Sequence, residues 1–198
     1  MFVIGLTGSI AMGKTTTARL FAEEGVPVHD ADAAVHELYA GEAAALIEAA
    51  FPGTTRNGTV DRPALGERVL GDQPALRRLE SIVHPLVRQA EQKFLDAAAA
   101  KGAAVAVLDI PLLFETGGES RVDATVVVSA PAEMQRARVL ERGLSLERLE
   151  AVLARQMPDA EKRRRADFVV DSAHGIEQAR TQVRQILTAV ARMPPRRK

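Results

Sequence analysis

The sequence from Gly8 to Thr15, Gly-Ser-Ile-Ala-Met-Gly-Lys-Thr, fits the pattern G-x-x-x-x-G-K-[ST] without a mismatch. The apolar run Phe2 to Leu6 before it predicts a buried strand, and Thr16 to Glu24 after it predicts a helix that stops at Gly25. A strand that leads through such a loop into a helix N-terminus directs several backbone N–H groups at one point, which makes an anion site. The alternative is a glycine-containing turn that binds nothing, and the flanking strand and helix weigh against it.

This loop predicts a nucleotide site with ATP and Mg²⁺ as its ligands. Lys14 is expected to reach the β- and γ-phosphates, and the Thr15 hydroxyl is expected to bind the magnesium ion. The predicted nucleotide-binding residues are Gly8, Ser9, Ile10, Ala11, Met12, Gly13, Lys14, Thr15 and Thr16.

Further short apolar runs predict the other strands of a sheet. After Phe2 to Leu6 they are Val26 to Val28, Ala103 to Leu108, Val122 to Val128 and Phe168 to Val170. Near-continuous Val, Ile and Leu with helical stretches between them is typical of a parallel sheet covered by helices on both faces. We therefore expect an α/β fold of the P-loop NTPase type, in which ligands bind beyond the C-terminal ends of the strands.

The long gap between the second and third strands predicts a mostly helical insertion that holds the second substrate. Its expected segments are a helix over 33–51 broken at Gly41, a turn-rich stretch with Pro52-Gly53 and Asn57-Gly58, and helices over 63–70, 74–83 and 84–101. Residues 132–166 are helical, rich in arginine and interrupted by Gly143 and Pro158. Most of these arginines are expected to face solvent, and one or two to close over the triphosphate.

The composition is that of an ordinary globular protein and excludes several kinds of site. The chain has 198 residues, of which 46% are hydrophobic, and its 26 basic and 26 acidic residues leave a net charge of zero. No global positive field favours nucleic acid, and the lack of cysteine rules out disulfides and thiolate metal sites. No apolar run reaches the roughly 20 residues that span a bilayer. We expect a cytoplasmic monomer or weak homo-oligomer without a nucleic-acid or membrane partner.

Three classes of P-loop protein compete for this sequence. GTP-dependent switches read guanine with Asn-Lys-x-Asp, which is absent because Asn57 is the only asparagine. Large mechanical ATPases need a longer chain, so small-molecule kinases remain, which hold an acceptor hydroxyl in line with the γ-phosphate and exclude water. A regulatory module without turnover is the alternative from another class. Intact Lys14, Thr15 and Asp32 argue against it.

A kinase needs a group that orients and deprotonates the acceptor hydroxyl, and Asp30 and Asp32 are the candidates. They follow the strand that we expect next to the P-loop strand, and side chains two apart on an extended segment point the same way. One of the two can instead cap the following helix. We assign Asp32 as the general base, and Asp30 to support of the site or contact with the substrate.

Three further residues have a functional and a structural interpretation. Asp109 ends the third strand, and it either binds Mg²⁺ or merely closes the strand in a turn. Glu115 follows an apolar run that looks buried, so its charge needs a partner, and we place it at the substrate site. His84 precedes Pro85 at an expected helix start, where it either caps the helix or contacts substrate.

Taken together, the residues resemble the dephospho-coenzyme A kinase family. The matching elements are Gly5-Leu6-Thr7-Gly8, Asp30-Ala31-Asp32, His84-Pro85, Pro111-Leu112-Leu113-Phe114-Glu115, Arg155-Gln156 and Asp171. They span nearly the whole chain. Shikimate-type or nucleoside-type kinases are the alternative with the same core, but related small kinases do not share both the Asp-Ala-Asp and the Pro-Leu-Leu-Phe-Glu elements.

The resemblance implies transfer of the ATP γ-phosphate to the ribose 3′-hydroxyl of dephospho-coenzyme A, the last step of coenzyme A synthesis. It implies that Asp32 is the base, that Arg142 in the lid binds phosphate, and that His84 and Glu115 lie near the acceptor. Thr7, Asp30 and Leu113 complete the expected substrate-binding set. The implied parts are a nucleotide-binding core over residues 1–32, 102–131 and 167–192, a helical coenzyme A domain over 33–101 and a mobile lid over 132–166. The terminal Pro-Pro-Arg-Arg-Lys separately predicts a disordered tail over 193–198.

The sequence departs from the family pattern at two places. The family's loop usually reads Gly-Gly-Ile-Gly-Ser-Gly-Lys-Ser, and here Ser9, Ala11 and Met12 replace two glycines and a serine. If Ala11 has a positive φ, the strain costs roughly 1 kcal/mol. The late Asp-Asn-Asn/Ser-Gly element reads Asp-Ser-Ala-His-Gly over residues 171–175, so the adenine contacts there are expected to differ.

Overall fold

A computed structural model describes residues 1–196 of the chain. The chain divides into two compact units, one made of Met1–His29 and Ala98–Lys198 and the other of Asp30–Ala97. We call them the sheet unit and the helical unit. The helical unit covers nearly the same residues as the insertion expected over 33–101. Within the described residues, no helix combines the length and the apolar character that crossing a membrane requires.

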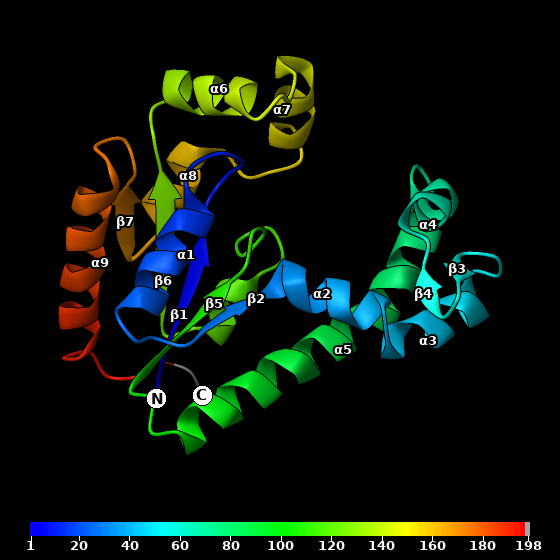
Figure 1. Ribbon diagram of the computed structural model, residues 1–198, viewed down its shortest axis with the longest axis horizontal. Helices are drawn as coiled ribbons and strands as arrows, with labels where there is room; N and C mark the ends of the chain where they lie inside the picture. The colour runs from blue at the N-terminus through cyan, green and yellow to red at the C-terminus, as the bar shows by residue number, and fades with distance from the viewer. Residues whose placement is uncertain (197–198) are drawn as a thin grey trace. The chain divides into compact units, whose positions relative to one another are not determined.

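The sheet unit is built on a five-stranded sheet (Figure 1). Its strands are β1 (Phe2–Thr7), β2 (Val28–Asp30), β5 (Val105–Asp109), β6 (Ala124–Ser129) and β7 (Phe168–Asp171), in the order β2-β5-β1-β6-β7. β1 pairs in parallel with β5 and β6, and β6 pairs in parallel with β7, which confirms the predicted parallel sheet. The expectation that the second strand neighbours the P-loop strand is wrong, because β5 lies between β2 and β1.

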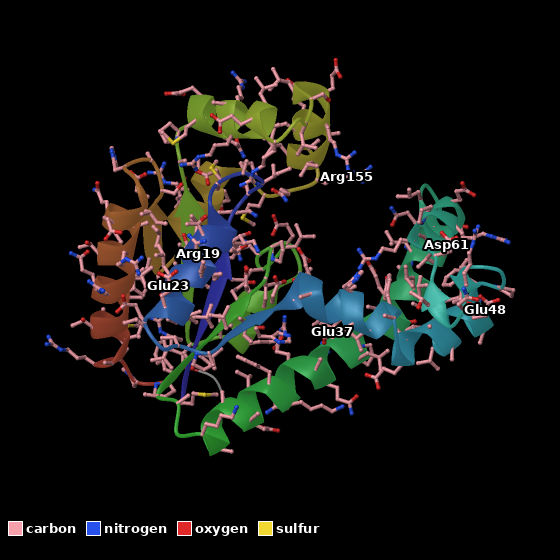
Figure 2. The ribbon with its side chains drawn as sticks, in the orientation of Figure 1. Arg19, Glu23, Glu37, Glu48, Asp61 and Arg155 are labelled. Carbon is pink, nitrogen blue, oxygen red and sulfur yellow. The ribbon has the colours of Figure 1, made fainter. Side chains whose placement is uncertain are left out.

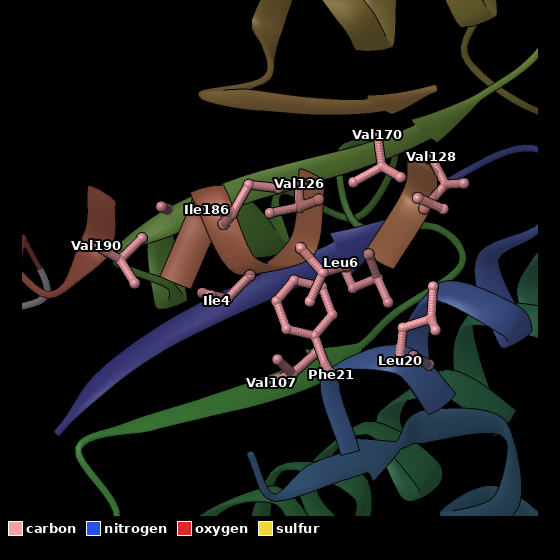
Figure 3. Packing of buried hydrophobic residues seen from close by; sticks show 14 of the residues in the cluster. Ile4, Leu6, Leu20, Phe21, Val107, Val126, Val128, Val170, Ile186 and Val190 are labelled. Carbon is pink, nitrogen blue, oxygen red and sulfur yellow. The ribbon is translucent and has the colours of Figure 1, made fainter. Parts of the chain in front are cut away.

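Helices α1 (Lys14–Glu23) and α9 (Ile176–Val190) cover one face of this sheet. Alternate side chains of β6, among them Val126 and Val128, pack there with Phe21 and Ile186 (Figure 3). The alternation follows from the pleat of a strand, which sends successive side chains to opposite faces. Burial of this cluster fixes β1 against α1 and thereby holds the two ends of the loop that joins them.

Helix α8 (Asp159–Arg165) lies against the opposite face, after α6 (Ala132–Glu141) and α7 (Leu146–Leu153). Ser129 alternates with Val128 on β6, and its hydroxyl donates to the Asp159 carboxylate at 2.7 Å. Lys162 of α8 is fully buried, and its Nζ lies 2.9 Å from Oε1 of Glu115 in an ion pair. The breaks between these helices fall at Gly143 and Pro158, where the sequence predicts them.

The helical unit has a core of its own. Its elements are α2 (Ala31–Tyr39), α3 (Glu42–Ala50), β3 (Thr55–Arg56), β4 (Thr59–Val60), α4 (Arg62–Val69) and most of α5 (Gln73–Ala100). Apolar side chains from four of the helices meet in this core, for example Leu38, Ile47, Leu65 and Leu79. The break expected at Gly41 separates α2 from α3.

The hairpin β3–β4 turns at Asn57 and Gly58, which have φ of 50° and 76°. An Asn-Gly turn of this kind matches the twist of two antiparallel strands. Glu48 and Asp61, both labelled in Figure 2, hold the segment on either side. The contacts are Glu48 with the amides of Gly53 and Thr54 at 2.7 and 3.1 Å, and Asp61 with Nε of Arg56 at 2.7 Å.

Helix α5 corrects the prediction of two helices over 74–83 and 84–101. The structure has one helix, Gln73–Ala100, with Pro85 inside it. A proline in a helix removes one N–H donor and costs about 3 kcal/mol. Buried side chains on both sides, Val83 before it and Leu95 after it, keep the helix continuous through that defect. His84 therefore lies in mid-helix and caps no helix start.

The structure corrects the expectation of a disordered tail over 193–198, because the described part of this segment makes defined contacts. Met193 packs against the core of the sheet unit. The Arg196 amide donates to Oδ1 of Asp123 at 2.8 Å, and its guanidinium donates to Oδ1 of Asp167 at 2.7 Å. Residues 197–198 lie outside the described residues.

Candidate active site

The loop predicted to bind phosphate runs from β1 into α1. Glycine is required at position 8, because a Cβ there would lie 2.7 Å from the carbonyl oxygen of Val128. Gly13 has a φ of 94° and Ala11 a φ of 60°. Ala11 therefore occupies the left-handed region, and the strain of about 1 kcal/mol expected from its replacement of glycine is present.

Side chains from α6 and from the segment after β7 bind the carbonyl groups of this loop. The contacts are Gln135 Nε2 to Ile10 O at 2.7 Å, Arg138 Nη1 to Ala11 O at 3.4 Å, and Ser172 Oγ to Met12 O at 2.7 Å. Arg138 also donates to the hydroxyl and the carbonyl of Ser172 at 2.9 and 2.7 Å. Sequence reasoning assigned none of these three side chains to the loop. The arginine-rich stretch was a signal, but it did not distinguish Arg138 from its neighbours.

The backbone amides of the loop remain available to a ligand. Among residues 1–196, the N–H groups of Ala11, Gly13, Lys14 and Thr15 donate to no protein acceptor. Because the bracing side chains occupy the carbonyls, the loop presents donors and not acceptors to an incoming anion. Such a set of amides at a helix N-terminus favours phosphate.

Lys14 and Asp109 meet beside the loop. Nζ of Lys14 lies 2.6 Å from Oδ1 of Asp109, whose side chain is almost fully buried at the end of β5. Thr15 is exposed next to Lys14. A hydroxyl and a carboxylate are oxygen ligands that Mg²⁺ accepts together with nucleotide phosphates, so Thr15 and Asp109 fit that ion. Within the described residues no cluster of three or more His, Asp or Glu could hold a metal by itself.

A cavity of about 290 Å³ adjoins the loop. It is lined by Gly13, Thr16, Thr17, Arg138, Glu141, Arg142, Ser172, Gly175, Ile176 and Ala179. The structure thus brings Arg142, the arginine predicted to bind phosphate, to the same cavity as two loop residues. Arg138 is bound to the loop and to Ser172, so Arg142 and the free backbone amides are the donors that this cavity offers an anion, beside one carboxylate, that of Glu141.

Asp30 and Asp32 stand at the start of α2 in the helical unit. Oδ1 of Asp30 accepts hydrogen bonds from the amides of Asp32 at 2.9 Å and Ala33 at 3.0 Å, so Asp30 is the N-cap. This is the capping role that the sequence left open for one of the pair. Asp32 lies in the first helical turn. The expectation that both carboxylates project from one extended segment is therefore wrong, because the strand ends at Asp30.

Asp32 lines a cavity of about 560 Å³ formed by residues of the helical unit. The other lining residues are Val35, Tyr39, Arg62, Leu65, Gly66, Val69 and Leu79. Cζ of Arg62 lies 5.3 Å from the centre of the Tyr39 ring. Burial raises the pKa of Tyr39 more than the charge of Arg62 lowers it, so the phenol stays neutral at physiological pH. This cavity combines one carboxylate, one guanidinium and an apolar wall.

Glu115 has the partner that its buried position requires. Its Oε1 pairs with Lys162 and also accepts a hydrogen bond from the Met157 amide at 2.8 Å. Burial raises the pKa of Glu115, but hydrogen bonds from Lys162 and Met157 lower it by more, so the net pKa is below the usual value. The carboxylate thereby ties the segment after β5 to α8.

The other residues predicted on the substrate side lie in different settings. The hydroxyl of Thr7 is buried and donates to the Pro111 carbonyl at 2.9 Å. Leu113 is fully buried. His84 is exposed on α5 and is not among the residues that line the cavity at Asp32.

Comparison with known proteins links the whole chain to one group of enzymes. The family model described as dephospho-CoA kinase matches residues 2–178. A curated dephospho-CoA kinase of Rhodopseudomonas palustris strain HaA2 is 64% identical over 198 residues, which is 100% of both chains. A solved structure from Thermus thermophilus has a TM-score of 0.85 and 36% identity, covering 96% of this chain and 97% of that one. A dephospho-CoA kinase structure from Campylobacter jejuni has a TM-score of 0.65 and 25% identity, covering 95% and 96%.

Proposed function

The chain belongs to the dephospho-CoA kinase family, and on this premise we propose that Asp32 is the general base of its reaction. The enzyme transfers the γ-phosphate of ATP to the ribose 3′-hydroxyl of dephospho-coenzyme A. The products are coenzyme A and ADP, and the reaction is the final step of coenzyme A biosynthesis. One observation carries the assignment of the base: among residues 1–196, the Asp32 carboxylate makes no hydrogen bond or ion pair, and it lines a cavity.

In the proposed mechanism, the Asp32 carboxylate takes the proton of the acceptor hydroxyl. The 3′-oxygen forms a bond to the γ-phosphorus as the bond to the β,γ-bridging oxygen breaks, and ADP leaves with that oxygen. The loop amides and Lys14 hold the phosphates in line with the acceptor. The free N–H groups of the loop and the position of Lys14 beside it support this role. Residues 8–16 are the proposed ATP-binding segment.

Arg142 and Mg²⁺ supply further positive charge in this proposal. Arg142 lines the cavity next to the loop, which supports contact with a phosphate that gains charge during transfer. Thr15 and Asp109 would hold the magnesium ion, which when bound neutralises charge on the β- and γ-phosphates. Asp109 also keeps the Lys14 ammonium group at the edge of the loop.

The remaining assignments are proposals of the same kind. Asp30 positions Asp32 through the α2 cap, and Glu115 and His84 stay candidates for the acceptor side. Since Thr7 and Leu113 are buried, they would act through the backbone that they hold in place. We also propose a core, a helical acceptor domain and an arginine-bearing lid over 132–166, in a cytoplasmic monomer or weak homo-oligomer. The balanced charge and the absence of cysteine agree with that location.

The substitution Asp32→Asn tests the base. We expect turnover of dephospho-coenzyme A to fall by about two to four orders of magnitude, because the proton acceptor is lost. The dissociation constant for ATP should stay within a factor of two or so, since the phosphate-binding loop is intact. Steady-state kinetics with mass-spectrometric detection of the 3′-phosphorylated product measures the first quantity, and calorimetry measures the second.

Glu37→Gln is the matched control, because Glu37 is an exposed carboxylate on the same helix and does not line the cavity. It should turn over like the unmodified enzyme. Near-normal turnover in Asp32→Asn would remove Asp32 from the mechanism.

A further inference from the structure

The cavity at Asp32 holds two opposite charges that do not pair. Its lining contains one carboxylate, that of Asp32, and one guanidinium, that of Arg62. Neither is engaged elsewhere: within residues 1–196 Asp32 has no side-chain partner, and the only contact of the Arg62 guanidinium is the face of Tyr39. Both side chains are exposed to solvent, so a ligand that enters the cavity can reach a carboxylate and a guanidinium without breaking an ion pair first.

A second carboxylate lies next to Arg62 in the sequence, that of Asp61, but it does not pair with the Arg62 guanidinium either. Asp61 directly precedes Arg62, yet its carboxylate binds Nε of Arg56 at 2.7 Å and caps α4 through the Ala64 amide at 3.2 Å. Asp61 is thus already used by the hairpin and the helix start. The guanidinium of Arg62 keeps its N–H donors for another acceptor.

Tyr39 holds that guanidinium in a defined place. The separation of 5.3 Å between Cζ and the ring centre is within the range of a cation–π contact. Among residues 1–196 no hydrogen bond or ion pair uses the N–H groups of this guanidinium, so they are free for a bidentate contact. A planar fork of this kind matches phosphate oxygens. Because the Tyr39 phenol stays neutral, it forms no ion pair with the Arg62 guanidinium.

We propose that Arg62, held on the Tyr39 ring, binds the 5′-diphosphate of the acceptor and thereby sets acceptor specificity. The inference rests on the proposed function, in which Asp32 receives the 3′-hydroxyl proton. The same ribose carries that hydroxyl and the diphosphate, so a cavity with one base and one cation matches both ends of this unit. Val35, Leu65 and Val69 offer an apolar wall to the uncharged part of the molecule.

Substitution of Arg62 tests this assignment. In Arg62→Ala we expect the KM for dephospho-coenzyme A to rise about tenfold or more, while the KM for ATP stays unchanged, because one charge-assisted contact to the acceptor is lost. Arg62→Lys keeps the charge without the fork and should recover part of the loss. Arg68→Ala is the control, since Arg68 is exposed on the same helix and outside the cavity. It should leave both constants unchanged.

Tyr39 adds a direct binding measurement, because it is the only tyrosine and the chain has no tryptophan. Titration with dephospho-coenzyme A without ATP should change its emission, and in Arg62→Ala the midpoint should move to higher concentration by the same factor as KM. Adenosine, which lacks the diphosphate, should give the same midpoint in both proteins. Tyr39→Leu, which removes the aromatic ring beneath Arg62, should raise the KM for dephospho-coenzyme A.

The outcomes separate this inference from the assignment of the base. An unchanged KM for dephospho-coenzyme A in both Arg62 variants would overturn the diphosphate site, whatever Asp32→Asn does. A raised KM in Arg62→Ala together with full turnover in Asp32→Asn would uphold the diphosphate site and remove the base. If Arg62→Ala does not fold, Arg62→Lys and Tyr39→Leu decide by the same criterion.

Discussion

Ala11 shows how a single residue can depart from a family pattern and still fit the fold. The sequence alone indicated that alanine in place of glycine costs free energy if φ is positive, and its φ of 60° meets that condition. The sequence could not show what compensates for the strain. Arg138 and Ser172 come from distant parts of the chain and bind the carbonyls of Ala11 and Met12.

The substitution Ser172→Ala tests this brace. The serine hydroxyl donates to Met12 at 2.7 Å and accepts from Arg138 at 2.9 Å, so its loss leaves two groups without that partner. We expect the KM for ATP to rise about three- to tenfold, in line with one or two net hydrogen bonds. The KM for dephospho-coenzyme A should not change. Ser81→Ala, at an exposed serine of α5, is the control, and equal ATP constants in the two variants would contradict the brace.

At the scale of elements, the sequence predicted which strands and helices exist better than it predicted where each of them begins and ends. All five predicted strands exist and the breaks fall at Gly41, Gly143 and Pro158 as predicted, but β2 is Val28–Asp30 and not Val26 to Val28. The prediction of a helix start at Pro85 is wrong, because packing of α5 on both sides outweighs a local proline signal. The position of β2 is also wrong, since an apolar run specifies a strand but not its neighbours.

The cap of α2 leads to a prediction at this scale. Asp30→Ala removes the acceptor for the amides of Asp32 and Ala33, and it should lower the free energy of unfolding by about 1 kcal/mol. Turnover should fall as well, because the first turn carries the proposed base. Asp30→Asn keeps a capping oxygen, and it should retain both properties. Denaturant titration and kinetics measure the two effects, and loss of turnover in Asp30→Asn at full stability would assign its carboxylate to the substrate instead.

At the scale of the whole molecule, the sequence points more directly to the proposed nucleotide site than to the proposed acceptor site. The loop is contiguous in sequence, so one motif identified residues 8–16 together with Lys14 and Thr15. The proposed acceptor cavity joins residues from α2, α4 and α5, and no motif connects Asp32 with Tyr39 and Arg62. Such side chains are brought together only by the packing of the helical unit.

Stability of the folded chain should fall on acidification. The pKa of Glu115 is lowered because hydrogen bonds from Lys162 and Met157 outweigh burial, and the pKa of Asp167 is lowered because Thr125 and Arg196 outweigh burial. Both folded-state pKa values are below the unfolded ones. Their contribution is therefore complete above the ordinary carboxyl range, near pH 4–5, and is lost as pH falls through the lowered values.

Denaturant titrations between about pH 3 and pH 7 measure this dependence. Glu115→Gln should lose about 3 kcal/mol at pH 7, because Lys162 is then buried without its counter-charge. Its stability should also depend less on pH in the acid range. Glu67→Gln, at an exposed glutamate, is expected to follow the unmodified chain. An unchanged acid profile in Glu115→Gln would show that the ion pair does not control it.

Helix α5 starts in the helical unit and finishes at Ala100, past the boundary at Ala97 and Ala98. One of the two covalent connections between the units is thus helical. The turn at that boundary is made of consecutive alanines, the residue with the highest helix propensity. A single glycine in that turn would lower its helix propensity by about 1 kcal/mol and would leave every proposed binding residue unchanged.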